Sequence, residues 1–175
     1  MSELMSPPPP LDALNALTPD ARAEVLRSFC GASSWVDALN RPHASRASFE
    51  AAVAQAFDAL DEAGWLAAFA HHPRIGDRAR LRERFARSGA LSEREQAAVA
   101  QADEATIDAL FVENQAYEAR HGHIFIVCAT GRSAAEMLEL LRARIGRSRE
   151  DECIACSDEQ RKITAIRVRN HFGAT

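Results

Sequence analysis

The sequence predicts an all-α fold, and three observations lead to that class. Apolar residues recur at helical spacing along most of the chain, with Phe49, Val53 and Phe57 as the clearest series. Helix start signals precede several of these stretches. The 175 residues suit one domain with a sizeable core, and no internal repeat divides them. We therefore expect a single-domain helical bundle over residues 11–175, with about seven to nine helices.

The N-terminal segment predicts a tail followed by two helices. Residues 1–10 end in four prolines, which cannot continue a helix, so this segment is expected to be a flexible tail. Thr18-Pro19 has the pattern of an N-cap and a first helical residue, and Cys30-Gly31 is expected to end that helix. Apolar residues within 35–39 predict a short second helix, which Arg41-Pro42 stops.

Two more helical stretches are expected before the His-Pro pair. Ser48 is expected to cap a helix whose apolar face runs from Phe49 to Leu60. Gly64 should interrupt it, and residues 65–69 should add a further turn or two. Because the residue before a proline is disfavoured in the helical region, His72 should lie where this helix ends.

The middle of the chain predicts an irregular segment and then two helices. Residues 74–91 are charged and without clear periodicity, as in a lid over a pocket. Ser92 is expected to begin one helix, and a longer one should run from about Asp103 to Arg120. Gly122 should end the longer helix.

The C-terminal part predicts two helices after an apolar run. Ile124–Ala129 is too short to assign as a strand from its pattern alone. Gly131 should turn the chain, and Ser133 should cap a helix that carries Met137. The last helix is expected over Asp158–Phe172.

Composition excludes several classes of protein. The net charge of −4 argues against broad nucleic-acid binding. No apolar run has the length of a membrane span, and no secretory signal is visible at the N-terminus, so we expect a cytoplasmic protein. Lys162 is the sole lysine, which argues against catalysis through a lysine Schiff base.

Cys153 and Cys156 form a Cys-x-x-Cys pair. A zinc site would need two more ligands at suitable spacing, and a thioredoxin-like site would need a βαβ context. Neither accompanies the pair, so reduced structural thiols are the favoured interpretation, and Cys30 and Cys128 are interpreted in the same way.

Chemistry is most strongly indicated by His72-Pro73, followed nineteen residues later by Ser92, Glu95 and Gln96. An imidazole exchanges protons near neutral pH, and a carboxylate can orient it or share that task. The hydroxyl of Ser92 and the amide of Gln96 are suited to hydrogen-bond the polar edges of a small substrate.

The Ser92-x-x-Glu95 spacing also has a purely structural explanation. It is the capping box, in which two side chains satisfy backbone N–H groups at a helix start. Ser133 and Glu136 repeat the spacing, so it is not functional evidence by itself. A helix N-terminus also offers N–H groups to an anionic ligand, and both roles are compatible.

Together with Asn114-x-x-Tyr117 and the run 125–129, these motifs resemble the OHCU decarboxylase family over about residues 12–170. OHCU is 2-oxo-4-hydroxy-4-carboxy-5-ureidoimidazoline, an intermediate of urate degradation. The resemblance implies a pocket between helices, His72 and Glu95 as catalytic residues, and no role for His71. The substrate-binding residues that it implies are Pro73, Ser92, Gln96, Phe125, Ile126, Val127, Cys128, Ala129 and Arg167.

The resemblance also implies a mechanism and an assembly. The substrate's own carbonyl and imine groups accept the electron pair left by CO₂, so neither a cofactor nor a metal is expected. His72 would handle the proton, Glu95 would orient the substrate and set the state of His72, and Arg167 would hold an anionic group. The implied product is (S)-allantoin, and the implied assembly is a homodimer.

Two other classes stay open at this point. One is a helical ligand-binding or adaptor module that keeps the fold without catalysis. The other is a metal hydrolase using His71, His72 and Asp77, although this spacing lacks the His-x-x-x-His of a helical zinc site. One departure from the family is the replacement of its usual Phe-Gly-Phe by His121-Gly122-His123, which adds two imidazoles near the expected pocket.

Overall fold

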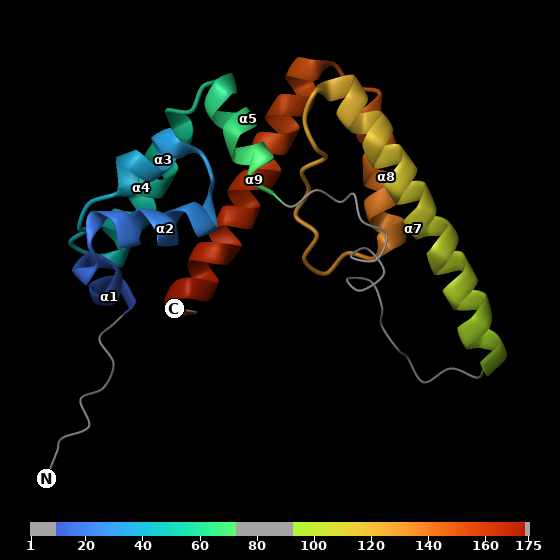
Figure 1. Cartoon of the computed structure of the whole chain (residues 1–175), viewed down its shortest axis with the longest axis horizontal. Coiled ribbons are helices and arrows are strands. Elements are labelled where there is room, and N and C mark those ends of the chain that lie inside the picture. The colour runs from blue at the N-terminus through green and yellow to red at the C-terminus, as the bar shows by residue number, and fades with distance from the viewer. Residues whose placement is uncertain (1–9, 73–92, 174–175) are drawn as a thin grey trace, which may run out of the picture. The chain divides into compact units, whose positions relative to one another are not determined.

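The computed structural model describes the backbone of residues 10–72 and 93–173, and the side chains of 10–72 and 104–173. This part of the chain contains eight helices and no strand, so the predicted all-α class is confirmed (Figure 1). It divides into two compact units, the first comprising residues up to His71 and from Arg161 onward, the second comprising His72–Gln160. The single domain over residues 11–175 stays a prediction.

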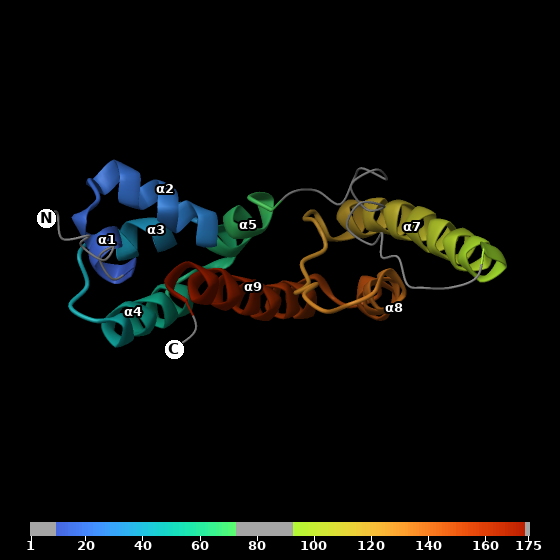
Figure 2. The same cartoon turned by 90° about the horizontal axis from the view of Figure 1, so that it is seen from below.

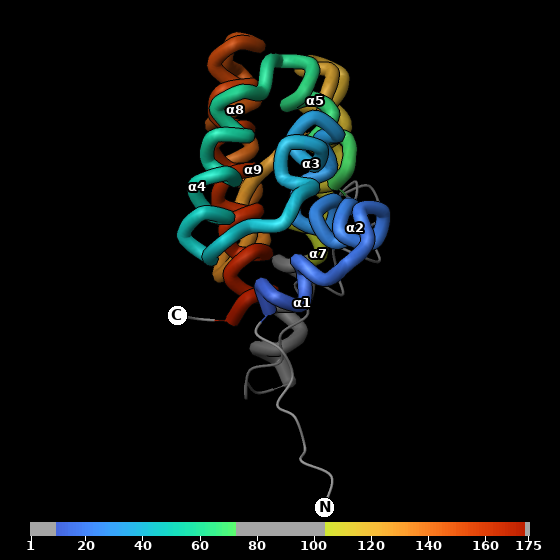
Figure 3. The backbone as a smooth tube through the Cα atoms, turned by 90° about the vertical axis from the view of Figure 1, so that its left-hand side faces the viewer, coloured from blue at the N-terminus to red at the C-terminus, as the bar shows by residue number. Residues whose placement is uncertain are grey.

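The first unit is built from five helices and the C-terminal half of α9. They are α1 (Pro10–Ala16), α2 (Pro19–Phe29), α3 (Ser33–Leu39), α4 (Arg46–Asp58) and α5 (Glu62–Ala70). Helix α3 contacts α2, α4 and α5, and Figure 3 shows it among them. Because α3 packs against three neighbours, its large apolar residues Trp35, Val36 and Leu39 are buried.

Aromatic rings fill the centre of the first unit. The Phe57 ring lies 5.4 Å from that of Trp35 and stacks at 5.4 Å on that of Trp65. The Trp65 ring lies 6.3 Å from that of Phe69. The Arg161 guanidinium covers both Phe57 and Trp65 at 5.1 and 5.3 Å from their centroids. These contacts fix α3, α4 and α5 by packing.

Local signals predicted part of this unit correctly. Thr18 caps α2 by accepting from the Ala21 N–H at 3.3 Å, with Pro19 as the first helical residue, and α2 ends at Cys30 as expected. The short helix before Arg41-Pro42 is α3. The helix α1 was not predicted: it begins at Pro10, a position where the missing N–H of proline costs nothing.

Two boundaries of the first unit differ from the prediction. Ser45, not Ser48, caps α4, and Ser48 is its partner in a reciprocal capping box. The prediction was wrong by three residues because both serines stand before the same apolar face. Gly64 does not interrupt a helix; it lies in the first turn of α5 and donates its N–H to the capping Asp61 at 2.8 Å.

The second unit contains α7 (Glu93–His121), α8 (Ala134–Ile145) and the N-terminal half of α9 (Arg149–Phe172). Helices α7 and α8 lie side by side (Figures 1 and 2). Their shared core is formed by buried apolar residues: Ile107, Leu110, Tyr117, Phe125, Val127, Ala134, Met137, Leu138 and Leu141. None of the described helices is both long and apolar enough to cross a membrane.

Two helices of the second unit are longer than predicted. The two helices expected after Ser92 are one, because the alanine-rich stretch 96–103 contains no glycine or proline to break it. Helix α9 begins at Arg149 rather than Asp158. Ser148 accepts from the Asp151 N–H at 3.1 Å and its hydroxyl donates to that carboxylate, so the charged stretch is a capped first turn.

The connection between α7 and α8 agrees with its prediction. Gly122 and Gly131 have φ values of 78° and 77°, which favour glycine. Ser133 forms a capping box with Glu136 at the start of α8. Residues 124–129 between these turns are neither helix nor strand.

A surface groove of about 440 Å³ lies between α4 and α9 in the first unit. Its lining includes Arg46, Glu50, Phe57 and Arg161, and none of the predicted site residues. The predicted substrate pocket between helices therefore stays a prediction.

Candidate active site

His72 directly follows the C-cap of α5, as the His-Pro pair predicted. Its Nε2 atom lies 2.6 Å from Oε1 of Gln160 on α9, and both residues belong to the second unit. His72 is partly buried, whereas Gln160 is 0% exposed. The ring is thus attached to a fixed amide in the protein interior.

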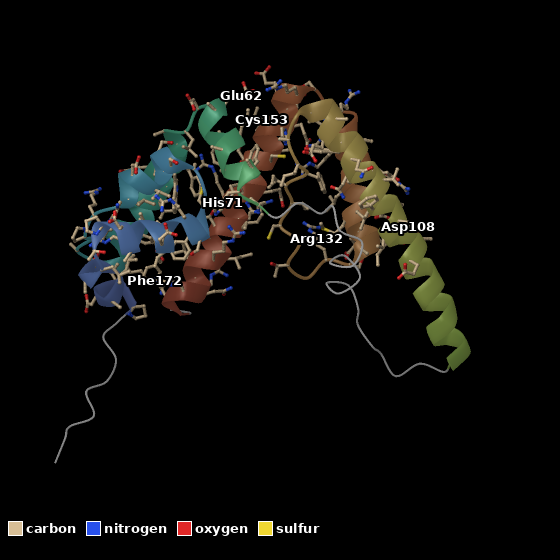
Figure 4. The ribbon with its side chains drawn as sticks, in the orientation of Figure 1. Glu62, His71, Asp108, Arg132, Cys153 and Phe172 are labelled. Carbon is tan, nitrogen blue, oxygen red and sulfur yellow. The ribbon has the colours of Figure 1, made fainter. Side chains whose placement is uncertain are left out.

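The residue that precedes His72 packs closely against a glycine of the first unit. A Cβ atom on Gly31 would lie 2.1 Å from Cβ of His71, so only glycine permits this approach of α5 to the end of α2. Figure 4 shows His71 at the end of α5. His71, which is not part of the family motif, therefore has a packing role at the position immediately before His72.

The irregular segment 124–129 is held by side chains. Arg144 donates to the Ile126 carbonyl at 2.9 Å, and the Cys128 N–H donates to Glu159 Oε2 at 2.6 Å. Arg132 donates to the Cys128 carbonyl at 3.1 Å. Because backbone groups outside regular structure need partners when buried, these contacts allow an apolar segment to be irregular.

A buried polar network supports this segment. Arg144 pairs with Glu152 at 2.6 Å, and Tyr117 donates its hydroxyl to Glu152 at 2.5 Å. Glu152 is 0% exposed, and the Arg144 guanidinium lies 4.7 Å from the Phe125 ring centroid. Because Arg144 also donates to Ile126, this ion pair is linked directly to the segment.

Burial governs proton affinities in the network. It raises the pKa of the Tyr117 hydroxyl far above its ordinary range, and neighbouring Cys156 and Glu152 act in the same direction. Burial also raises the pKa of the Cys156 thiol, more than Tyr117 and Arg144 lower it. Burial opposes the charge of Arg144, yet its bond to Glu152 and the nearby Cys156 raise its pKa overall. Arg144 therefore keeps its charge beside Glu152, while Tyr117 and Cys156 stay neutral.

All four cysteines are free, with Cys30 and Cys156 buried. Cys153 lies on α9 (Figure 4), and Cys156 accepts from Arg144 at 3.1 Å. The described residues contain no cluster of three or more His, Cys, Asp or Glu suited to a metal ion. Asp77, the third residue of the metal hypothesis, lies outside them.

Arg167 lies on the part of α9 that belongs to the first unit. Its Nη1 donates to the Phe29 carbonyl at 3.0 Å, and Thr164, one turn earlier, donates to the same carbonyl at 3.1 Å. Burial lowers the pKa of Arg167, more than nearby Cys30 raises it. One of its five N–H donors is thus used to fix the side chain on the end of α2.

The structure brings some predicted residues together and leaves others undescribed. His72 and the segment Phe125–Ala129 share the second unit, where consecutive residues of α9 contact both. Pro73 and the side chains of Ser92, Glu95 and Gln96 lie outside the described residues, so their roles stay predictions.

Sequence reasoning missed Glu159 and Gln160. A signal was present: Gln160 lies two helical turns before Arg167, so the two residues project near the same face of α9. The long separation from His72, 88 residues along the chain, hid the contact.

The structure is thus that of an all-α protein in which His72 is held by the buried amide of Gln160. The irregular segment 124–129 of the same unit is held by side chains. The OHCU decarboxylase family model matches residues 15–169. The chain therefore belongs to the OHCU decarboxylase family, and the resemblance inferred from the motifs is confirmed.

Individual relatives agree with this assignment. The uric acid degradation bifunctional protein TTL of Arabidopsis thaliana is 32% identical over 147 residues, 82% of this chain and 45% of the relative. This chain thus matches less than half of that relative's length. A crystal structure of OHCU decarboxylase in the presence of (S)-allantoin has a TM-score of 0.66 at 28% identity, covering 86% of this chain and 97% of that one. A structure of (S)-allantoin synthase shares the fold, with a TM-score of 0.64 at 16% identity, over 93% of this chain and 54% of that one.

Proposed function

We propose that this protein decarboxylates OHCU to (S)-allantoin in urate degradation, using neither cofactor nor metal. The observation that carries the proposal is the attachment of the motif histidine, His72, to Gln160, beside the glutamate that holds the Cys128 amide. It occurs in a chain that matches the family model over residues 15–169.

The reaction requires control of an electron pair and a proton. The bond between the ring carbon and the carboxylate breaks, CO₂ leaves, and the pair moves into the carbonyl and imine groups of the substrate. A proton then adds from one face to the adjacent ring carbon, which bears the ureido group, and this fixes the chirality of the product. The hydroxyl on the carbon that lost CO₂ gives up its proton and becomes a carbonyl. The protein must stabilise the developing enolate-like charge and deliver the proton from a set direction.

The residues divide these tasks. His72 delivers the proton, and Glu95 orients the substrate and sets the state of His72. Ser92 and Gln96 hydrogen-bond the ring or the ureide. Arg167 holds an anionic group through a guanidinium fixed on the Phe29 carbonyl.

Backbone groups of Phe125–Ala129 complete the substrate contacts, together with Pro73. The bonds from Arg144 and Glu159 hold this segment in its irregular course before substrate arrives. Such preorganisation lowers the cost of aligning the substrate.

The experiment is a circular-dichroism time course on freshly generated OHCU. The substrate decays spontaneously to racemic product, so only an enzyme produces an (S)-allantoin signal. A trace equal to that of the blank contradicts the proposal and leaves the chain a ligand-binding or adaptor module.

Two histidine variants test the role of His72. His72→Ala should lower turnover by about 10²–10⁴-fold, the usual loss when a general acid or base is removed. His71→Ala is the matched control: it keeps the Cβ atom that packs on Gly31 and should lose little. Equal, mild effects of both substitutions contradict the assignment.

Glu95→Gln separates catalysis from capping. Glutamine serves a capping box as well as glutamate does, so a purely structural Glu95 would leave activity intact and change stability by less than about 1 kcal/mol. We expect turnover to collapse with the melting temperature almost unchanged. Full activity would return Glu95 to a structural role.

We also propose a cytoplasmic homodimer as the working form. The support is family membership alone. Light scattering coupled to size-exclusion chromatography measures the assembly, and a monomeric mass at working concentration contradicts it.

A further inference from the structure

We propose that Gln160 is a positioning residue that keeps a proton on Nε2 of His72, so that Nδ1 is the nitrogen that exchanges protons with substrate. This inference rests on the proposed function for its catalytic meaning. The tautomer itself is a property of the protein without substrate.

The geometry assigns donor and acceptor. Oε1 of Gln160 lies 2.6 Å from Nε2 of His72, well within hydrogen-bond distance. An amide oxygen accepts and never donates, so the ring nitrogen must carry the hydrogen. In a neutral imidazole one nitrogen is protonated and the other accepts, so a proton held on Nε2 leaves Nδ1 as the basic atom.

Gln160 is a rigid anchor for this bond. Its side chain is 0% exposed, and a buried amide is costly unless it is hydrogen-bonded. Glu159, the preceding residue of α9, accepts from the Cys128 N–H. Rotation of this part of the helix about its axis would break that bond, so Gln160 holds a fixed direction.

A neutral amide suits this position better than a carboxylate would. A buried carboxylate in contact with the ring would favour the imidazolium and retain the proton. An amide oxygen fixes ring orientation and tautomer without adding a negative charge. Proton affinity is then left to other groups, among which Glu95 is the proposed one. The division of labour resembles that in other sites where a third group orients the catalytic histidine.

The test compares Gln160→Met, Gln160→Glu and the control Thr164→Val. Methionine has a similar length but lacks the amide oxygen, whereas glutamate keeps an acceptor at the same place. Thr164→Val removes a hydrogen bond of another fully buried polar residue on α9 without touching His72. It should retain the kcat of the wild type.

Nitrogen-15 spectra of the imidazole rings give the first readout. The His72 signals are identified by their loss in His72→Ala. The wild type and Gln160→Glu should show a proton on Nε2, and Gln160→Met should show a mixture of tautomers. A wild-type ring protonated on Nδ1 alone, or an unchanged spectrum in Gln160→Met, overturns the proposal.

Kinetics on OHCU give the second readout. Gln160→Met should lower kcat by about 10²-fold, the scale of a small misplacement of a catalytic group, with KM changed less than about threefold. Gln160→Glu should recover only part of that loss, because it restores the acceptor for Nε2 while its carboxylate favours the imidazolium. A variant that loses stability while kcat stays at the wild-type value would mark Gln160 as only structural.

The two proposals fail in different ways. A wild-type protein without turnover contradicts the proposed function, and the ring spectrum then decides alone whether Gln160 holds His72. An active wild type with an insensitive ring spectrum contradicts only the role of Gln160. If Gln160→Met does not fold, the Nε2-protonated ring expected in the wild type and in Gln160→Glu still decides the proposal.

Discussion

The core around α3, α4 and α5 and the segment 124–129 bury apolar residues in opposite ways. In the former, Trp35, Phe57 and Trp65 pack ring against ring, and their backbones are satisfied within helices. In the latter, Phe125, Ile126 and Val127 are just as buried, yet no helix or strand takes their backbone groups.

The difference shows what an irregular buried segment requires. Where the backbone is helical, apolar contact alone can fix the structure. Where it is irregular, charged side chains must enter the core, here Arg144 and Glu152. The course of this irregular segment therefore depends on an ion pair that is linked to its backbone through Arg144.

Arg144→Met should produce the largest effect, because it removes the buried, 2.6 Å ion-pair partner of Glu152 and leaves only the half-exposed Arg147, at 3.9 Å, as a cation beside that carboxylate. Breaking such a pair costs about 3–5 kcal/mol. The control is Arg142→Met, on the same helix, which removes a pair with Glu113 whose arginine is 57% exposed and should cost less than about 1 kcal/mol. Urea unfolding measures both, and equal losses would contradict the comparison.

Gly31→Ala should produce the next largest effect and tests the packed region. The added Cβ would meet Cβ of His71 at 2.1 Å, so the end of α5 must shift. Overpacking of this kind costs about 1–3 kcal/mol. Gly146→Ala is the control, since nothing lies within 4 Å of its added Cβ. Thermal unfolding of the two variants should differ clearly, and the same melting temperature for both refutes the close approach.

Glu159→Gln should have a smaller effect, confined to the irregular segment. A hydrogen bond to a neutral oxygen is weaker than one to a carboxylate by about 1 kcal/mol. The Cys128 amide should therefore exchange its hydrogen about fivefold faster. Glu150→Gln, at an exposed position in the first turn of α9, should leave that amide unchanged. Amide exchange followed by NMR measures both, and unaltered protection in Glu159→Gln contradicts the bond.

His123→Phe should have the smallest effect, visible only in acid. Burial lowers the pKa of His123 below its usual value of 6.5, so below that pH the unfolded chain binds a proton more readily than the folded chain. The free energy of unfolding should therefore fall as pH decreases from 6.5 through the lowered folded-state pKa. Phenylalanine should flatten part of this slope while its ring keeps the edge contact with Tyr117. Unfolding curves at several pH values measure the slope, and parallel slopes in both proteins refute this account.

Local signals in the sequence predicted much of the fold. Thr18-Pro19 and Ser133-x-x-Glu136 act within one helical turn, so neighbouring residues are sufficient to predict these helix starts. The errors occurred where two local signals compete. Ser45 and Ser48 both precede one apolar face, and the acidic residues after Ser148 were interpreted as loop although they suit a helix N-terminus.

The site was less predictable because its contacts join distant parts of the chain. The motif predicted His72 and the segment 125–129 as site residues, and these roles stay predictions. It did not reveal Gln160, which contacts His72 across 88 residues, or the need for Gly31 beside His71. Such pairs have no periodicity or spacing that a single sequence can display.

The buried thiols give each unit its own reporter of opening. Cys30 lies in the core of the first unit and Cys156 in that of the second, and burial raises the pKa of both thiols. An alkylating reagent reacts with the thiolate, so each should be modified only when its surroundings open. Cys128 and Cys153, which are partly exposed, should react first. Mass spectrometry of the later two modifications would then measure two opening rates in one native protein, without any engineered label.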